Sequence, residues 1–236
     1  MPQNLNMPNA IITGTSRGLG RAFAGKLLKE GWNVWGLSRN PSNIKNTNFT
    51  ECLVDITDGV AVQNAVNLIS QSSPDIDLLV NNAGAASMNA FLLTPAKTAE
   101  ALMKLNYLGT FHCLQAVGKL MVRRRSGLII NITTVAVPLA LAGEAAYVAS
   151  KAAVDALTKV AADELKSQGI VVIGLGFGPL DTDLTKAVDK QKLNQINQRI
   201  SRPHGTTLNE AVDFIFEHLG KKSLTSGDMY YLGKIP

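Results

Sequence analysis

The sequence predicts an α/β fold, in which one doubly wound parallel sheet carries helices on both faces. Three observations lead to this prediction. Short apolar runs of strand length alternate along the chain with stretches of helical period. These runs are apolar on both faces, as buried strands of a parallel sheet must be. The 236 residues are 46% hydrophobic and 17% charged, which suits a single core.

Six strands and four helices are expected. The strand candidates are residues 10–13, 33–37, 52–54, 78–80, 128–132 and 170–175. The helix candidates are residues 19–30, 60–71, 98–125 and 145–167. Right-handed crossovers place such helices on both sides of the sheet. Since no repeat, low-complexity tract or linker divides the chain, residues 1–236 are interpreted as one domain.

Composition narrows the classes of protein to which the chain can belong. The first ten residues contain neither the basic nor the apolar region of an export signal. No apolar run reaches membrane-spanning length without a charge or a glycine. Cys52 and Cys113 are too few for a disulfide framework. We therefore expect a cytoplasmic protein that does not bind a membrane.

The net charge of +5 is scattered along the chain, so we expect no nucleic-acid partner. The exception is the run Arg123, Arg124 and Arg125, which closes an expected helix. Cations at this position complement the helix dipole. Docking of an acidic partner is the alternative interpretation, and both stay open.

Residues 181–208 are more polar and more basic than the rest of the chain. The basic residues are Lys186, Lys190, Lys192, Arg199, Arg202 and His204. The segment follows the carboxyl end of an expected strand, which is the edge where substrates bind in such sheets. We interpret it as a substrate lid, with a plain pair of surface helices as the alternative.

A glycine-rich turn follows the first expected strand and opens the first expected helix. It consists of Gly14, Thr15, Ser16, Arg17, Gly18, Leu19 and Gly20. Glycines at the first, fifth and seventh positions let the backbone turn tightly and approach a pyrophosphate, whose charge the helix N-terminus stabilises. In this context the turn predicts a Rossmann-like dinucleotide site.

The end of the second expected strand indicates which dinucleotide binds. An acidic residue there would bind a free ribose 2′-hydroxyl, but this chain has Ser38 and Arg39 and no acid between residues 31 and 40. Arg39 can bind a 2′-phosphate through paired hydrogen bonds, and Arg17 supplies a second cation. We predict NADP(H); two merely solvated arginines are the alternative.

Tyr147 and Lys151 lie four residues apart in an expected helix, so their side chains share one face. Such a pair can move a proton, because an ammonium favours the phenolate and lowers a tyrosine pKa from its usual value of about 10. Chance alone could supply one such pair in a chain of this composition. Its weight depends on the motifs around it.

Those motifs make the chain resemble the short-chain dehydrogenase/reductase family along nearly its whole length. Besides the glycine turn and Tyr147–Lys151, the matching residues are Asp55, Ile56, Asn82, Ala83, Gly84, Asn106, Gly178, Leu180 and Thr182. The resemblance implies that Asp55 and Ile56 meet the adenine and that Thr182 holds the nicotinamide carboxamide. It also implies that Tyr147 is the general acid or base, that Lys151 holds the nicotinamide ribose, and that Asn106 steadies a water relay.

Two residues depart from the family pattern. Thr134 stands where most members have a serine that binds the substrate oxygen, and it keeps the hydroxyl but adds a methyl group. Phe177 stands where a proline is usual. These departures keep open a second hypothesis, that the chain is an NADP-binding sensor or scaffold without catalytic turnover.

The expected substrate is a small carbonyl compound or alcohol. Residues 135–142 are apolar and would form a wall beside the reacting carbonyl. The basic lid and Arg123–Arg125 would suit an acyl thioester on a carrier protein, as in the ketoacyl carrier-protein reductases that the sequence resembles. Small apolar residues surround most of the helix at 145–165, which predicts a subunit contact in a homodimer or homotetramer.

Overall fold

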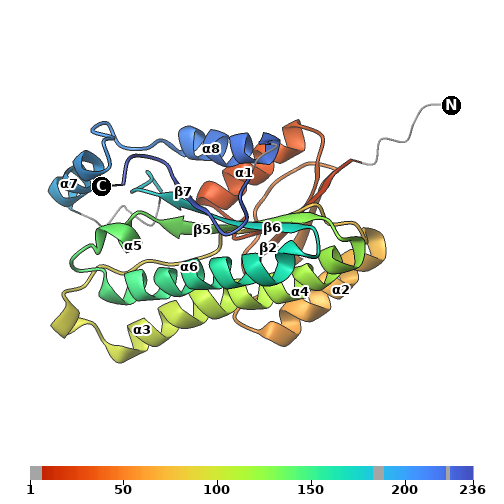
Figure 1. The fold of residues 1–236 in the computed structure, drawn as a ribbon, viewed down its shortest axis with the longest axis horizontal. Coiled ribbons are helices and arrows are strands. Elements are labelled where there is room, and N and C mark those ends of the chain that lie inside the picture. Colours follow the sequence, from red (N-terminus) through yellow and green to blue (C-terminus); the bar gives the residue numbers. More distant parts are fainter. Residues whose placement is uncertain (1–6, 183–188, 222–223, 236) are drawn as a thin grey trace.

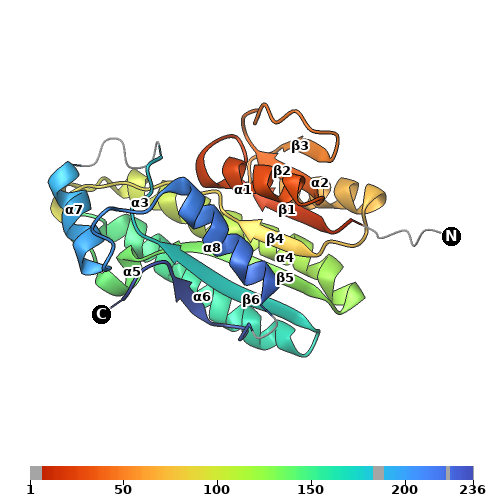
Figure 2. The same cartoon turned by 90° about the horizontal axis from the view of Figure 1, so that it is seen from above.

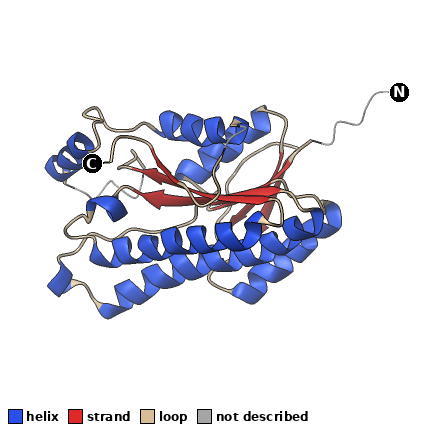
Figure 3. Ribbon diagram, viewed as in Figure 1, coloured by secondary structure: helices blue, strands red, loops and turns tan. Residues whose placement is uncertain are grey.

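The computed structural model describes residues 7–182, 189–221 and 224–235. Seven parallel strands form one sheet in the order β3-β2-β1-β4-β5-β6-β7 (Figure 3). The strands are β1 (Asn9–Thr13), β2 (Asn33–Ser38), β3 (Phe49–Leu53), β4 (Leu78–Asn81), β5 (Gly127–Thr134), β6 (Ile170–Phe177) and β7 (Met229–Tyr231). The prediction of a doubly wound parallel sheet is therefore confirmed.

Helices cover both faces of the sheet (Figures 1 and 2). On one face lie α1 (Gly18–Lys29) and α8 (Leu208–Gly220). On the other lie α2 (Gly59–Ser72), α3 (Ala96–Leu102), α4 (Gly109–Arg124) and α6 (Ala145–Lys166). The short α5 (Ala136–Leu139) and α7 (Lys190–Arg199) lie at the end of the sheet toward which the arrow of β5 points.

The core has two layers, one on each face of the sheet, and β1 shows how the sequence builds them. Ile11 joins the layer under α2 and α4, while Ala10 and Ile12 join the layer under α1. All three side chains are fully buried. Successive side chains of a strand point to opposite faces of the sheet. A strand that is buried on both faces therefore has apolar residues at every position.

Several boundaries differ from the sequence-based expectation. The third strand is Phe49–Leu53 rather than residues 52–54, and β7 and α8 were not predicted. The single helix expected at residues 98–125 is interrupted by a π-helical segment, Met103–Leu108, between α3 and α4. The apolar stretch before Tyr147 contains α5, and a short 3-10 helix spans Phe91–Leu93.

The arginine run Arg123–Arg125 lies at the opposite end of the sheet from the strands' carboxyl ends, because β5 begins two residues after it. Arg124 forms an ion pair with Asp77, and Arg125 donates a hydrogen bond to the Ser167 carbonyl at 2.7 Å. Arg125 closes α4 with φ +56°. The run thus fastens the end of α4, and its position does not suit carrier-protein docking beside the reacting groups.

β7 ties the C-terminal segment to the sheet and to α7. Tyr231 packs directly over Gly176, where a Cβ atom would come within 2.3 Å of its ring. Farther along, the Lys234 amide donates to the Ile200 carbonyl at 3.0 Å, just after α7. The C-terminal segment therefore anchors the end of α7 beside the carboxyl ends of β5 and β6.

Candidate active site

Most of the predicted cofactor and catalytic residues line one cavity of about 660 Å³ at the carboxyl ends of the strands. It opens where β1 and β4 are neighbours in the sheet, which is the point where the strand order reverses. Doubly wound sheets bind ligands at this switch point, because the loops that follow the two strands lead away from each other and leave a crevice.

The glycine turn between β1 and α1 forms one end of the cavity. Gly14 and Gly18 have φ values of +75° and +57°, which side chains disfavour. A Cβ atom on Gly20 would come within 2.4 Å of Asn82 Nδ2 and 2.5 Å of the Gly14 carbonyl oxygen. The first two glycines therefore permit the turn, and the third lets α1 begin against the loop after β4.

Asn82 joins this turn to the loop after β4. Its amide group donates to the Thr13 carbonyl at 2.9 Å. The Thr13 hydroxyl in turn accepts from the backbone amides of Asn82 and Ala83, at 3.0 and 2.9 Å. The two loops that line the crevice are thus held together before any ligand binds, so the site is preorganised.

The ends of β2 and β3 form the next part of the wall. Ser38, Arg39, Asp55 and Ile56 all line the cavity there. Asp55 accepts a hydrogen bond from the Thr57 backbone amide at 2.9 Å. That hydrogen bond, together with the charge of Arg39, lowers the pKa of Asp55. Asp55 is therefore an ionised acceptor at the position expected for the adenine.

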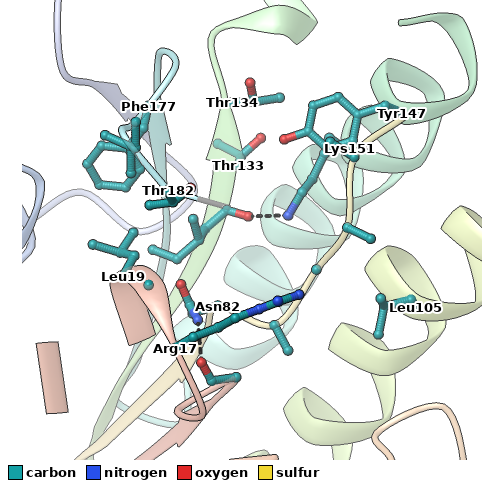
Figure 4. Close-up of a pocket in the computed structure, with 18 of the residues that line it drawn as sticks. Arg17, Leu19, Asn82, Leu105, Thr133, Thr134, Tyr147, Lys151, Phe177 and Thr182 are labelled. Carbon is teal, nitrogen blue, oxygen red and sulfur yellow. Dashed lines mark hydrogen bonds between the residues drawn. The ribbon is translucent and has the colours of Figure 1, made fainter. Parts of the chain in front are cut away.

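Tyr147 and Lys151 lie in the first two turns of α6 and face the end of β5. Figure 4 shows the Tyr147 hydroxyl and the Lys151 amine pointing into the cavity, with Thr134 beside them and with Arg17 and Asn82 at the glycine-turn end. Lys151 is only 5% exposed, and its Nζ donates to the Ile132 carbonyl at 2.8 Å. The pair predicted from sequence therefore shares one site with the glycine turn.

Thr134 is the last residue of β5 and is buried beside Tyr147. Its Oγ1 accepts a hydrogen bond from the Ala136 amide at 3.1 Å. The hydroxyl also hydrogen-bonds Tyr147, which acts to lower the Tyr147 pKa. Thr134 thus places the hydroxyl of the serine that is usual here beside Tyr147.

Burial shifts the two titratable groups in opposite directions. It raises the pKa of Tyr147 to about 12, as do the Glu144 and Asp155 carboxylates, while the Thr134 hydroxyl acts in the other direction. Burial lowers the pKa of Lys151 to about 8, and Asp155 opposes this change. The Tyr147 pKa in the ligand-free protein is thus above its usual value rather than below it, as the sequence had led us to expect, because desolvation is the largest effect.

Asn106 lies in the π-helical segment and is fully buried. Its side-chain oxygen accepts from the Ala85 amide, and its nitrogen donates to the Ala85 carbonyl and to Ser150 Oγ, each at 2.9 Å. Both amide hydrogens are therefore used within the protein. This side chain braces the loop after β4 against α6, and it has no hydrogen left to donate to a water relay.

Asp155, which was not singled out from the sequence, lies one turn beyond Lys151 on α6. It is 8% exposed and accepts a hydrogen bond from the Thr133 hydroxyl. Burial raises its pKa, and the hydrogen bond from Thr133 and the charge of Lys151 lower it. Asp155 and Lys151 are thus two buried groups of opposite charge beside the reacting end of β5.

Glu144 is a second residue that sequence reasoning missed. It directly precedes α6, lines the cavity and is 8% exposed. Burial raises its pKa, and Lys192 of α7 opposes the shift. An acidic residue in the otherwise apolar stretch before Tyr147 was the available signal.

The turn after β6 closes the opposite side of the cavity. Gly178, Leu180 and Thr182 line it, and the Thr182 methyl group lies over Gly18. Phe177 also lines the cavity, and its ring packs edge-on against Phe214 with centroids 5.8 Å apart. Phe177 therefore fills core space between β6 and α8, which accounts for a large side chain at this position.

The expected lid at residues 181–208 is described only in part, since residues 183–188 lie outside the described residues. Within the described part, Leu193 and Ile196 of α7 line the cavity. Arg199 donates to the Leu139 carbonyl at 3.2 Å, and Lys192 donates to the Ala142 carbonyl at 2.8 Å. α7 is thus fastened to the loops around α5, and its movement as a lid stays a prediction.

Three of the predicted site residues lie behind the cavity lining rather than in it. Thr15 is fully buried under the glycine turn, and Gly20 and Asn106 support the surrounding loops. The lining also contains residues that the sequence did not single out. Among them are Asn40, Pro41, Ser87, Met88, Leu105, Ile132, Thr133, Glu144, Leu193 and Ile196.

A glycine turn at the switch point of a parallel sheet, in one cavity with a Tyr–Lys pair, defines a dinucleotide-dependent oxidoreductase. The short chain dehydrogenase profile matches residues 8–193. The chain therefore belongs to the short-chain dehydrogenase family.

Relatives and solved structures agree with this assignment. The chain is 33% identical to the 3-oxoacyl-(acyl-carrier-protein) reductase FabG of Staphylococcus epidermidis, over 81% of this chain and 83% of the relative. It is 35% identical to the 3-oxoacyl-(acyl-carrier-protein) reductase of Synechocystis sp., over 79% of each. Two solved structures, ElxO with NADP and a gluconate 5-dehydrogenase of Burkholderia cenocepacia with NADP and tartrate, both superpose with TM-score 0.85. ElxO is 26% identical to this chain, and the match covers 96% of this chain and 97% of ElxO. The gluconate 5-dehydrogenase is 27% identical, and the match covers 96% of this chain and 93% of the dehydrogenase.

No helix among the described residues is both long and apolar enough to span a membrane.

Proposed function

We propose that this chain is an NADPH-dependent reductase of carbonyl compounds in which Tyr147 donates the proton. The observation that carries the proposal is the meeting of the glycine turn and the Tyr147–Lys151 pair in one cavity. A carbonyl oxygen between Thr134 and Tyr147 would have two hydroxyl donors. Preorganised donors at a developing oxyanion are a large source of catalysis.

The residues around the glycine turn fit NADP(H). The positive φ values of Gly14 and Gly18 and the start of α1 suit a pyrophosphate. Arg17 and Arg39 line the same cavity, and no acid stands between residues 31 and 40. Cations at this place favour a ribose 2′-phosphate. The NADP in the ElxO and gluconate 5-dehydrogenase structures supports this assignment.

The chemistry that NADPH supplies when bound is hydride transfer to the carbonyl carbon. The side chains of the protein handle the proton. With a pKa of about 12, the Tyr147 hydroxyl is protonated at neutral pH and can donate to the oxygen as it gains charge. Lys151, whose pKa is about 8, is still charged at neutral pH and stabilises the phenolate that forms. Lys151 would also hold the nicotinamide ribose, and Thr182 the carboxamide.

The substrate end of the cavity is mainly apolar. Val135, Ala136, Leu141, Leu193 and Ile196 line it near Tyr147. These side chains suit a ketone with an apolar arm. Acyl thioesters are included among the candidates because relatives named as 3-oxoacyl-(acyl-carrier-protein) reductases match most of the chain.

The test is oxidation of NADPH by the purified protein with a panel of ketones, aldehydes and acyl thioesters. We expect turnover with at least one class, a lower KM for NADPH than for NADH, and a loss of about 10²- to 10⁴-fold in the rate for Tyr147→Phe. A variant that reduces substrate as fast as the wild type would refute the role of Tyr147.

The second candidate function, an NADP-binding sensor or scaffold, keeps one supporting feature, the departure from the family pattern at Phe177. It makes a different prediction in the same experiment. Tight NADPH binding without turnover of any panel member would favour it over the reductase.

We also propose that the protein forms a homo-oligomer through α6. Ala145, Ala149, Ala156 and Val160 recur at helical spacing and are all exposed, and the Val160 side chain is 57% exposed. Leu108, at the end of the π-helical segment, is a further exposed apolar side chain. Exposed apolar side chains that recur along one helix are typical of a protein–protein contact.

We also propose that the protein works in the cytoplasm, where free thiols such as those of Cys52 and Cys113 stay reduced.

A further inference from the structure

Glu144 lies in the wall of the cavity, and its carboxylate has no hydrogen-bond partner within the described part of the chain. The residue is 8% exposed and stands three residues before Tyr147. Its backbone is well bonded, since the carbonyl accepts from the Val148 amide at 2.7 Å. Only the carboxylate lacks a donor. Because the carboxylate oxygens are not enclosed by protein atoms, they can accept a hydrogen bond from a molecule that occupies the cavity.

Two structural roles can be set aside. Glu144 is the residue before α6, yet its side chain caps no backbone amide of the helix. It also forms no ion pair within 4 Å among the described residues, because the nearby Lys192 donates instead to the Ala142 carbonyl at 2.8 Å. The carboxylate therefore stabilises neither the helix nor the fastening of α7.

The position of Glu144 connects it to the reaction. One helical turn separates it from Tyr147, so the two side chains start about 5–6 Å apart. The cavity walls around them, at Leu141 and Ile196, have no side-chain donor to offer. A molecule that occupies the cavity beside the reacting carbonyl can then supply a hydrogen-bond donor to the carboxylate.

We propose that Glu144 selects substrates with a hydroxyl group on a carbon next to the reacting carbonyl, and that its carboxylate accepts the hydrogen bond from that hydroxyl. The preferred substrates are thus hydroxyketones with an apolar arm. A carboxylate in the same place on the substrate would be repelled by Glu144. An ammonium group on the substrate would be attracted to Glu144 less strongly than its charge suggests, because the nearby Lys192 cation offsets the negative field of the carboxylate.

This inference rests on the proposed reductase function and names a substrate class for it. The test compares kcat/KM for four matched ketones with NADPH at saturation. These are benzylacetone, its derivatives with a hydroxyl or an amino group on the methyl carbon, and benzylpyruvate. For the wild type we expect the hydroxyketone to exceed benzylacetone by about tenfold or more, as a hydrogen bond to a buried charged group gives. We expect benzylpyruvate to be the poorest of the four.

Glu144→Leu keeps much of the volume and removes the acceptor, so the ratio of kcat/KM for the hydroxyketone to kcat/KM for benzylacetone should fall to about one. Glu144→Gln should weaken the preference and improve benzylpyruvate. The matched control is Glu164→Gln, which makes the same change at an exposed position of the same helix and should leave all four ratios unchanged.

The outcomes separate this inference from the proposed function. Turnover with a hydroxyl preference that Glu144→Leu leaves intact would overturn the role of Glu144 alone, as would a wild-type preference for the aminoketone. No turnover of any ketone or thioester would instead overturn the reductase function.

A second measurement does not depend on turnover. A carboxylate kept for substrate rather than for folding should cost stability in the ligand-free protein. Thermal unfolding without ligands should therefore give a Tm for Glu144→Leu equal to or above that of the wild type. A clear decrease would mean that Glu144 supports the fold.

Discussion

At the scale of single residues, burial determines the pKa values of Tyr147 and Lys151 on α6. The same desolvation raises the pKa of Tyr147 to about 12 and lowers that of Lys151 to about 8. Both shifts favour the neutral form of each group. At a pH between about 8 and about 12, Tyr147 is still protonated while Lys151 has lost its charge. The pH dependence of the rate therefore separates the contributions of the two residues.

The first prediction is a fall in reductase kcat/KM above about pH 8. Lys151 loses its charge as pH rises through its pKa of about 8, and the phenolate of Tyr147 then loses its stabilising cation. Tyr147 remains protonated in this range, so it does not cause the fall. The measurement is the pH profile of kcat/KM for NADPH, which reports on the free enzyme. A profile that stays level to pH 10 would contradict the assignment.

The second prediction concerns Asp155, which opposes the lowering of the Lys151 pKa. Asp155→Asn can keep the hydrogen bond from Thr133 but removes the negative charge. The Lys151 pKa should then fall below 8, and the alkaline limb of the pH profile should move to lower pH. If Asp155 only supports packing, the rate would fall at every pH and the limb would not move.

At the scale of single residues, the sequence predicted the site residues that belong to a recognisable motif. It missed the site residues whose importance comes from burial in the fold. Tyr147 and Lys151 could be found because their spacing on a helix is itself the signal. Asp155 and Glu144 could not be ranked above other acids, because their importance comes from their burial beside those two residues. The direction of the Tyr147 pKa was mispredicted for the same reason.

At the scale of elements, strong periodicity was predictable and short or interrupted elements were not. The apolar run of β1 and the long α6 were found with small boundary errors. β7 has only three residues, too few for a period-two pattern, and its place is set by packing over Gly176. The π-helical segment consists of residue types that also occur in α-helices, so the sequence does not reveal that its turn contains an extra residue.

The third prediction tests how closely α1 approaches the loop after β4. In Gly20→Ala the new methyl group would lie within 2.5 Å of Asn82 Nδ2 and the Gly14 carbonyl oxygen, so both must move. We expect a loss of about 1–3 kcal/mol in the free energy of unfolding, and weaker NADPH binding. Urea unfolding and NADPH titration measure the two effects.

The matched control for this prediction is Gly25→Ala in the same helix, where a Cβ atom meets nothing within 4 Å. There the substitution should stabilise the protein by up to about 1 kcal/mol, because alanine favours a helix interior. Equal effects at the two positions would show that close packing at Gly20 is not the cause.

At the scale of the whole molecule, the apolar surface of α6 gives the fourth prediction. The wild type should be a dimer or tetramer by light scattering, and Val160→Glu should shift it toward the monomer, because a charge in an apolar contact is left unpaired. Val60→Glu on α2 is the control, since Val60 is 72% exposed on a different helix. A wild type that is strictly monomeric would end this proposal.

The meeting of β1 and β4 at the centre of the sheet also bears on how such a chain can diverge. The walls expected to meet the dinucleotide come mainly from residues before 85, whereas Thr134, Glu144 and α7 come from later in the chain. Genetic exchange between relatives at a point within α4 would therefore join an intact site for the adenine and pyrophosphate to a new substrate half. Selection could then change what the protein reduces without altering its source of reducing power.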